Sequence, residues 1–205
     1  MVKDKSFRRC VLAAVQHDLC SRGRIVAAAR HLFSARGFHQ TAMSELAQVA
    51  EVSVGQIYRL FAGKDAIIQA IVMEDAGGKR DELARICEDA TKGRITIEVA
   101  FVELAKRALS KGDEALSFEI MAEAHRNAGV ADSIGGLCQG FRDVISELAC
   151  VANPALTATE LEGAEELVLA FMFGLGHRTL SRPQLSAEET ARLTGRMMVA
   201  AVRAL

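Results

Sequence analysis

The sequence contains little proline and few aromatic residues. Its 205 residues include two prolines, one tyrosine and no tryptophan. A backbone that is so rarely interrupted by proline can form long helices. No segment has the strict alternation of apolar and polar residues that is typical of a half-buried strand. Because half of the residues are hydrophobic, a buried core is available, and the sequence predicts an all-α fold.

Long uncharged segments are missing as well. The longest apolar stretch, residues 167–175, is much shorter than the roughly 20 residues of a membrane span. Residues 1–9 are polar and basic, unlike a secretory signal. The five cysteines form no C-x-x-C pair, and an odd number of scattered cysteines suggests reduced thiols. We therefore expect a cytoplasmic protein with no membrane partner.

Motifs of catalysis and cofactor binding are absent from the sequence. It has no H-E-x-x-H zinc motif, no phosphate-binding glycine loop and no Ser-His-Asp arrangement on strand turns. Cys10, His17 and Cys20 would share one face of a helix, so a metal or thiol sensor is one interpretation of them. Packing of an N-terminal helix is the other, because no fourth ligand is in view. We expect no enzyme activity, no cofactor and no metal site.

Positive charge is concentrated in the first third of the chain. Residues 1–65 hold 10 Lys/Arg and 5 Asp/Glu, whereas residues 66–205 hold 15 and 21. This split is typical of a chain that presents one end to a polyanion, although a solvated face without a partner would give the same split. The first basic residues form either an arm that reaches DNA or a solubilising tail: Lys3, Lys5, Arg8 and Arg9.

Apolar residues recur at helical spacing along most of the chain. The first clear helix ends before Gly37, which has the character of a C-terminal helix stop. Further breaks are marked by glycine or by proline, as at Pro154 and Pro183. The expected helices cover residues 22–36, about 43–50, about 54–61, a longer segment from 64, and then 94–110, 113–127, 130–150, 158–179 and 187–204.

The two short helices in this series have the pattern of a helix-turn-helix. Thr41 precedes the first as a candidate N-cap, and Ser53 begins the second in a capping-box pattern with Gln56. Small residues such as Ala47 and Gly55 would let the helices cross closely. The first helix would then support the second, whose slim, polar start can enter the major groove of DNA.

A series of motifs runs through residues 22–73. In order they are LF-x-x-x-GF at 32–38, LA at 46–47 and VS-x-G-x-x-Y-x-x-F at 52–61, followed by Lys64. Together they resemble the tetracycline-repressor (TetR) family of bacterial transcription regulators. Gly63 and Gly23 depart from the family, which usually has a capping serine and an acidic residue at these places.

The resemblance implies a two-domain, all-α protein of about nine helices, with a possible extra N-terminal helix. Residues 1–66 would comprise a basic segment and the helix-turn-helix domain, whose core is 22–66. Residues 67–205 would form a larger helical domain for effector binding and dimerisation.

The resemblance also implies which residues bind DNA. Thr41, Tyr58 and Lys64 would hold phosphates. Gln56 would pair with adenine and Arg59 with guanine or a phosphate, next to Val54 and Gly55 at the base edges. Alternatively, Tyr58 is a core aromatic residue and Arg59 a solvated charge. The full predicted set is Thr41, Ser53, Val54, Gly55, Gln56, Tyr58, Arg59 and Lys64.

The second half of the chain combines apolar bulk with isolated polar groups. Such a mixture is typical of a pocket for a small hydrophobic or drug-like effector, and equally of ordinary amphipathic helices. The candidate pocket residues are Phe101, Leu104, Phe118, Met121, Glu119, His125, Phe141 and Phe171.

The last two expected helices have broad apolar faces with small residues among large ones, which permits close helix packing. In the TetR family the final two helices form a four-helix dimer interface, whereas the alternative is that both faces close the core of one chain. The candidate interface residues are Ala164, Val168, Phe171, Leu175, Leu193, Met197 and Ala200.

The leading hypothesis is a homodimeric repressor that binds a palindromic operator in double-stranded DNA. A small molecule would release it, and an efflux or transporter operon would be a common target in this family. A DNA-binding regulator or activator without an effector is the alternative, and the absence of catalytic motifs argues against an enzyme. The effector, the operator and the regulated genes are beyond the sequence.

Overall fold

The computed structural model describes residues 3–110 and 112–205, and side chains from residue 18 onward except those of residues 79, 80 and 111. Lys3, Lys5, Arg8, Arg9, Cys10 and His17, which the sequence singles out, lie outside the described side chains. Within the described residues the chain is helical and contains no strand, which confirms the all-α prediction. None of the described helices is both long and apolar enough to cross a membrane.

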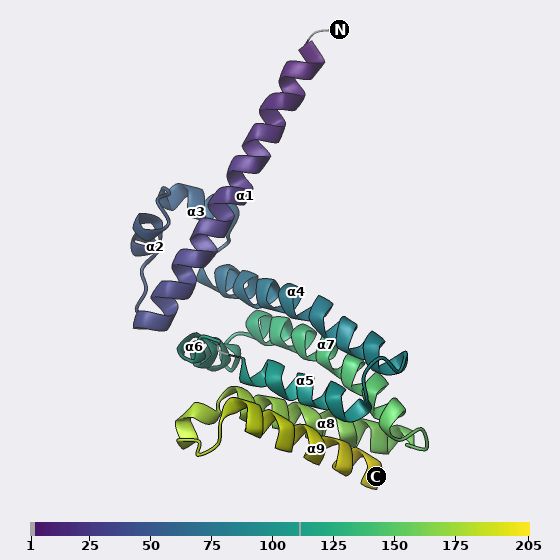
Figure 1. Ribbon diagram of the computed structural model, residues 1–205. Coiled ribbons are helices and arrows are strands. Elements are labelled where there is room, and N and C mark those ends of the chain that lie inside the picture. The colour runs from purple at the N-terminus through teal and green to yellow at the C-terminus, as the bar shows by residue number, and fades with distance from the viewer. Residues whose placement is uncertain (1–2, 111) are drawn as a thin grey trace. The chain divides into compact units, whose positions relative to one another are not determined.

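The described elements are nine α-helices and one short 3-10 helix (Figure 1). In chain order they are α1 (Lys3–Arg36), α2 (Met43–Val49), α3 (Val54–Leu60), α4 (Lys64–Thr91), α5 (Ile97–Leu109), α6 (Glu114–Ala124), α7 (Ala128–Ala152), α8 (Ala158–Gly176), η1 (Arg178–Ser181) and α9 (Ala187–Ala204).

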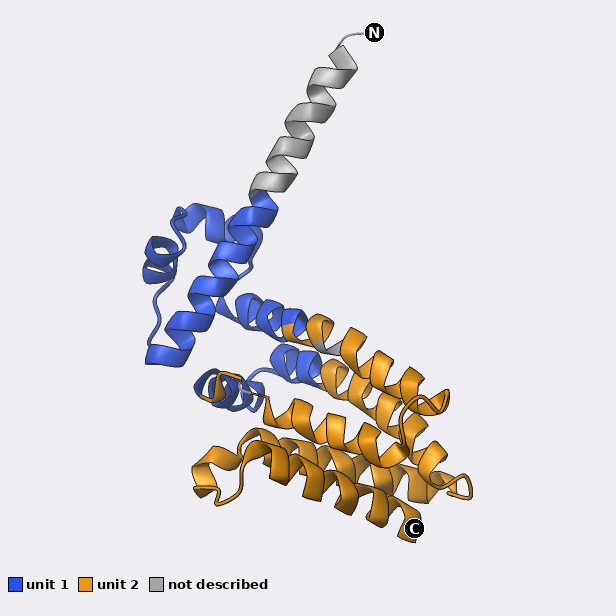
Figure 2. Ribbon diagram, in the orientation of Figure 1, with its two compact units in different colours: residues 1–74, 115–134 blue, residues 75–114, 135–205 orange. Residues whose placement is uncertain are grey.

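The chain divides into two compact units, which Figure 2 shows in different colours. Unit 1 consists of Met1–Glu74 and Ala115–Ile134, and unit 2 of Asp75–Glu114 and Gly135–Leu205. Unit 1 therefore combines the first three helices with most of α6. The sequence-based boundary between residues 66 and 67 stays a prediction.

Apolar residues on the inner faces of α1, α2 and α3 form the core of unit 1. Phe33, Leu46 and Ile57 are fully buried, one on each helix, and the three helices contact one another. The Phe33 ring also meets the Phe38 ring edge to face, with centroids 5.2 Å apart. This packing fixes the orientation of α3 and determines which of its faces is exposed to solvent.

Unit 2 is organised around α5, which packs against both α8 and α9. Phe101 and Leu104 of α5 are fully buried in this core. Capping boxes begin α8 and α9, as their sequences indicate. The hydrogen bonds of Thr157 hold the pKa of Glu160 below its ordinary value, and the Ser186 hydroxyl does the same for the pKa of Glu189.

Two local expectations need correction. Ala42, not Thr41, is the N-cap of α2, and it makes no side-chain capping bond. Thr41 is buried instead, and its hydroxyl donates to the carbonyl oxygen of Gly37 at 2.9 Å. Helix α8 ends at Gly176, because the chain continues as the 3-10 helix η1 rather than to residue 179.

Candidate nucleic-acid interface

The turn between α2 and α3 is tight and internally bonded. Glu51 adopts a positive φ of 53°, a left-handed conformation that is uncommon outside glycine, and the Val52 amide donates to the carbonyl oxygen of Ala47 at 3.0 Å. Ser53 then caps α3 by accepting the Gln56 amide at 3.1 Å. The other half of the expected capping box, a bond from the Ser53 amide to the Gln56 side chain, stays a prediction.

Helix α3 has one buried face and one exposed face. Ile57 is fully buried against the core, whereas the Val54 and Tyr58 side chains are 38% and 55% exposed. Gly55 and Arg59 are exposed beside them. A short helix with a slim N-terminus and an exposed outer face is the element that enters a major groove, so α3 has the geometry of a recognition helix.

Two polar side chains of α3 are held by α1. The Gln56 side-chain nitrogen donates to the hydroxyl of Ser21 at 2.8 Å, and Ser21 is fully buried. Arg59 forms an ion pair with Asp18. The sequence-based assignment of Gln56 and Arg59 to base edges stays a prediction, and both residues have α1 partners that the sequence did not indicate.

Lys64, at the start of α4, is bonded to the loop between α1 and α2. Its ammonium group donates to the carbonyl oxygens of Phe38, His39 and Thr41 at 2.8, 3.3 and 3.0 Å, and it lies 4.8 Å from the centroid of the Phe38 ring. All three hydrogens of the ammonium group therefore have acceptors. In this arrangement Lys64 positions the loop that precedes α2.

Two carboxylates of α6 contact the same loop, within unit 1. The Phe38 amide donates to Glu119 Oε2 at 2.8 Å, and Glu123 Oε2 lies 3.1 Å from His39 Nε2. Among the described side chains, Glu123 is the one charged residue that is buried. Sequence reasoning assigned Glu119 to an effector pocket and missed this contact, because an acidic residue on an amphipathic helix has the same pattern in both roles.

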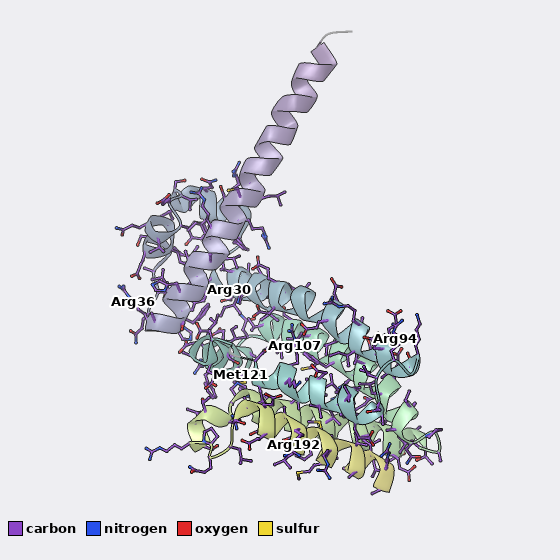
Figure 3. All side chains as sticks on the ribbon, viewed as in Figure 1. Arg30, Arg36, Arg94, Arg107, Met121 and Arg192 are labelled. Carbon is purple, nitrogen blue, oxygen red and sulfur yellow. The ribbon has the colours of Figure 1, made fainter. Side chains whose placement is uncertain are left out.

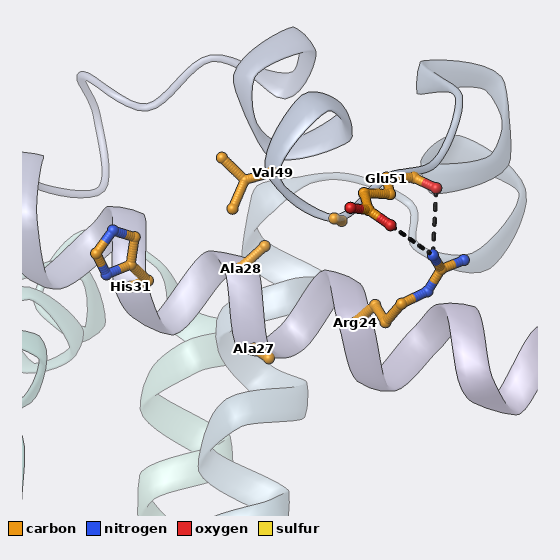
Figure 4. Close-up of a pocket in the computed structure, with 7 residues that line it drawn as sticks. Arg24, Ala27, Ala28, His31, Val49 and Glu51 are labelled. Carbon is orange, nitrogen blue, oxygen red and sulfur yellow. Dashed lines mark hydrogen bonds and ion pairs between the residues drawn. The ribbon is translucent and has the colours of Figure 1, made fainter.

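Arginines of α1 form further ion pairs within unit 1. Arg36, labelled in Figure 3, pairs with Glu45 of α2. Figure 4 shows Arg24 reaching Glu51, with the closest side-chain atoms 3.8 Å apart, beside an open groove of about 320 Å³. These pairs neutralise part of the positive charge that the sequence places at this end of the chain.

The predicted pocket residues are distributed over both units. Phe101 and Leu104 are fully buried in the core of unit 2, and Phe141 and Phe171 pack against that core. The others belong to unit 1: Phe118, Glu119, Met121 and His125. Their assignment to an effector site stays a prediction.

The predicted dimer residues also differ in exposure. Ala164, Val168 and Leu175 lie in the core of unit 2, whereas Leu193 and Met197 of α9 are exposed. Ala200 is exposed and Phe171 half-buried. On α8 an open apolar depression of about 360 Å³ is lined by Leu167, Ala170, Phe171, Gly174 and Leu175. The exposed apolar surface of the two helices therefore lies partly on residues that the sequence analysis did not select.

Among the described residues no cluster of three His, Cys, Asp or Glu side chains is arranged to hold a metal ion. Cys20 and Cys150 are exposed free thiols. Cys87 is buried, and burial together with its hydrogen bond to Glu147 raises the pKa of its thiol to about 12.

We expect Cys87 to resist alkylation under conditions that modify Cys20 and Cys150. A thiol with a pKa of about 12 is almost entirely protonated at pH 8, and the thiolate is the reactive form. Peptide mapping after brief iodoacetamide treatment at pH 8 should find Cys87 modified only after denaturation. Modification of Cys87 at the rate of Cys20 in the folded chain would contradict this.

The same shift in pKa makes stability depend on pH. The Cys87 thiol ionises at lower pH in the unfolded chain than in the folded chain, so this group lowers the free energy of unfolding as the pH rises above about 9.

Comparisons with known proteins agree with this geometry. Residues 25–71 match the model of bacterial regulatory proteins of the tetR family. The HTH-type transcriptional regulator UidR of Escherichia coli K12 is 38% identical over 114 residues, which span 54% of this chain and 55% of the length of UidR. This chain thus matches about half the length of that relative.

Two solved structures are similar over most of the chain. GusR of Salmonella enterica is 26% identical and has a TM-score of 0.67, with 88% of this chain and 95% of GusR covered. FadR of Bacillus subtilis, solved in complex with stearoyl-CoA, is 15% identical with a TM-score of 0.70, and the match covers 87% of this chain and 97% of FadR. The second likeness concerns the fold alone.

Proposed function

We propose that the chain is a member of the tetR family of bacterial regulatory proteins, whose model residues 25–71 match, and that it is a homodimeric transcription repressor that binds a palindromic operator and is released by a small molecule. The observation that carries the DNA-binding part is the outer face of α3, where Val54, Gly55, Tyr58 and Arg59 are exposed directly after the turn. The fully buried Ile57 anchors the opposite face.

Within this proposal the residues of α3 divide into two groups. Val54, Gly55, Gln56 and Arg59 meet base edges, with Val54 limited to apolar contact such as a thymine methyl group. Tyr58 contacts the DNA backbone through its hydroxyl. Ser53 caps the helix, whose N-terminus then faces the phosphates.

Thr41 and Lys64 support DNA binding through the loop that precedes α2. The Thr41 side chain is buried, and the Lys64 ammonium group is bonded to three loop carbonyls. We infer that these two residues affect DNA affinity through the position of α2, and that the exposed backbone near them supplies the phosphate contact.

Dimerisation through α8 and α9 would give the protein two recognition helices. The exposed apolar residues Leu167, Ala170, Leu193 and Met197 support this part, together with the open depression on α8. A two-fold dimer places its two α3 helices on successive major grooves, about 34 Å apart, and so reads an inverted repeat.

Release by a small hydrophobic molecule rests on the family and on FadR, a structural neighbour that was solved with stearoyl-CoA. Control of an efflux or transporter operon rests on the family alone. In this scheme the effector acts by favouring one of two arrangements of the DNA-binding heads.

The proposal is tested with a duplex that the full chain selects from a randomised pool. Tyr58→Ala should weaken binding to this duplex by about 1–3 kcal/mol, a factor of roughly 5 to 150, at one fixed salt concentration. Its exposure means that the change leaves the core intact. Fluorescence anisotropy measures the affinity, and sedimentation of the complex should give two chains per duplex.

Leu180→Ala is the control, because Leu180 is exposed in η1 of unit 2 and should leave the affinity unchanged. Equal affinities for wild type and Tyr58→Ala would contradict the assignment of α3. A single chain on the selected duplex would contradict the dimer.

A further inference from the structure

One face of α1 contacts α3 at three places. Asp18 pairs with Arg59, Ser21 bonds Gln56 at 2.8 Å, and Arg22 Nη1 donates to the carbonyl oxygen of Leu60 at 3.4 Å. Residues 18, 21 and 22 share one helix face, as do residues 56, 59 and 60. This face of α1 therefore holds both long polar side chains of the recognition helix.

The two side-chain contacts differ in how easily another group can replace the α1 partner. Ser21 is fully buried, and a buried hydroxyl requires a hydrogen-bond partner, so the loss of its bond to Gln56 costs more than the loss of an exposed ion pair. The Asp18 and Arg59 side chains are 35% and 60% exposed. An ion pair with this exposure is weak, so another anion or acceptor can replace Asp18 as the partner of Arg59.

We propose that Asp18 is a specificity-determining residue of DNA binding, which holds Arg59 back from non-specific DNA. This inference rests on the proposed function. When Arg59 leaves Asp18 for a backbone phosphate, it exchanges one oxyanion for another and gains little. A guanine edge offers two acceptors in the geometry of the guanidinium group. Arg59 is therefore released only at a sequence where the other contacts of α3 bring guanine within reach.

Asp18→Asn should bind non-specific DNA more tightly than the wild type does. Without the carboxylate, Arg59 gains one phosphate contact on a scrambled duplex. Each such contact contributes a salt slope of about −0.9, so the gain in affinity should grow about eightfold as the salt is lowered from 1 M to 0.1 M. Affinity for the duplex selected by the wild type should change much less, so the ratio of the two affinities falls by several-fold.

Arg59→Gln separates this role from a general effect of negative charge. If Asp18 acts through Arg59, Asp18→Asn gives no gain on scrambled DNA in the Arg59→Gln background. Asp18→Glu, which keeps the carboxylate, should retain the wild-type affinity ratio. Glu51→Gln is the matched control, because it removes one carboxylate from a comparable pair with Arg24 of α1 and should affect both duplexes equally.

The measurement is a set of anisotropy titrations of the full-length variants against the selected and the scrambled duplex, each at several salt concentrations. An equal gain on both duplexes from Asp18→Asn, or a gain that persists with Arg59→Gln, would overturn the role of Asp18. Failure of the wild type to bind either duplex would instead overturn the proposed function itself. Thermal unfolding of each variant should match the wild type, because the pair is exposed.

Discussion

Replacing Lys64 with methionine should destabilise the DNA-binding unit by about 2–3 kcal/mol. Methionine keeps most of the apolar stem beside the Phe38 ring but removes the ammonium group that donates to three loop carbonyls. Hydrogen bonds from a charged donor contribute about 1.5–3 kcal/mol each, and part of this is recovered where water replaces the donor. Hydrogen exchange should show amides of the loop and of α2 opening roughly 30 to 150 times more often.

Lys92→Met is the control for this substitution. Lys92 directly follows Thr91, the last residue of the same helix, and pairs with Glu88 on the surface, so its loss should change little. Equal effects of the two substitutions would contradict the role of Lys64. The salt slope of DNA binding should be the same for Lys64→Met and the wild type, and a slope reduced by about 0.9 would show that Lys64 contacts a phosphate instead.

Gly195→Ala should lower the stability of unit 2 by about 2 kcal/mol, even though alanine favours helix by about 1 kcal/mol over glycine. A Cβ atom at Gly195 would lie 2.7 Å from both the Cα and the amide nitrogen of Val102. Both atoms belong to the backbone of α5, so α5 and α9 would have to separate, and overpacking of this kind costs about 1–3 kcal/mol. Differential scanning calorimetry should detect a Tm lower by roughly 4–8 °C.

Gly136→Ala is the control in the same unit, and it should raise stability instead of lowering it. Gly136 lies within α7, and a Cβ atom there would meet no atom within 4 Å. The substitution should therefore raise stability by about 0.5–1 kcal/mol through helix propensity alone. If Gly195→Ala were as stable as Gly136→Ala, α5 and α9 would not depend on this close approach.

Local signals in the sequence predicted where most helices lie. Helices α8 and α9 begin at the expected residues, 158 and 187, where the structure places capping boxes of Thr157 with Glu160 and of Ser186 with Glu189. Such a cap depends only on neighbours in the chain. Thr41 shows the limit of this reasoning. Its sequence position suits an N-cap, but packing of the loop turned it inward, where it bonds the Gly37 carbonyl.

Contacts between distant residues could not be predicted in the same way. The sequence shows Glu119 as an isolated polar group among apolar residues, but not that it accepts the Phe38 amide 81 residues away. The same holds for Asp18 and Arg59, which are 41 residues apart. A helical pattern identifies the face of a side chain, whereas its partner depends on how the helices pack. The motif therefore indicated α3 as the reading element but not the α1 residues that hold its side chains.

The central claim is that the outer face of α3 reads a base sequence. The most direct test is the ratio of the full chain's affinities for the duplex that it selects and for a scrambled duplex of the same composition, at 0.15 M salt. We expect a ratio of at least about 10³, as is typical of specific recognition. Equal affinities for the two duplexes, or no binding to either, would contradict the claim.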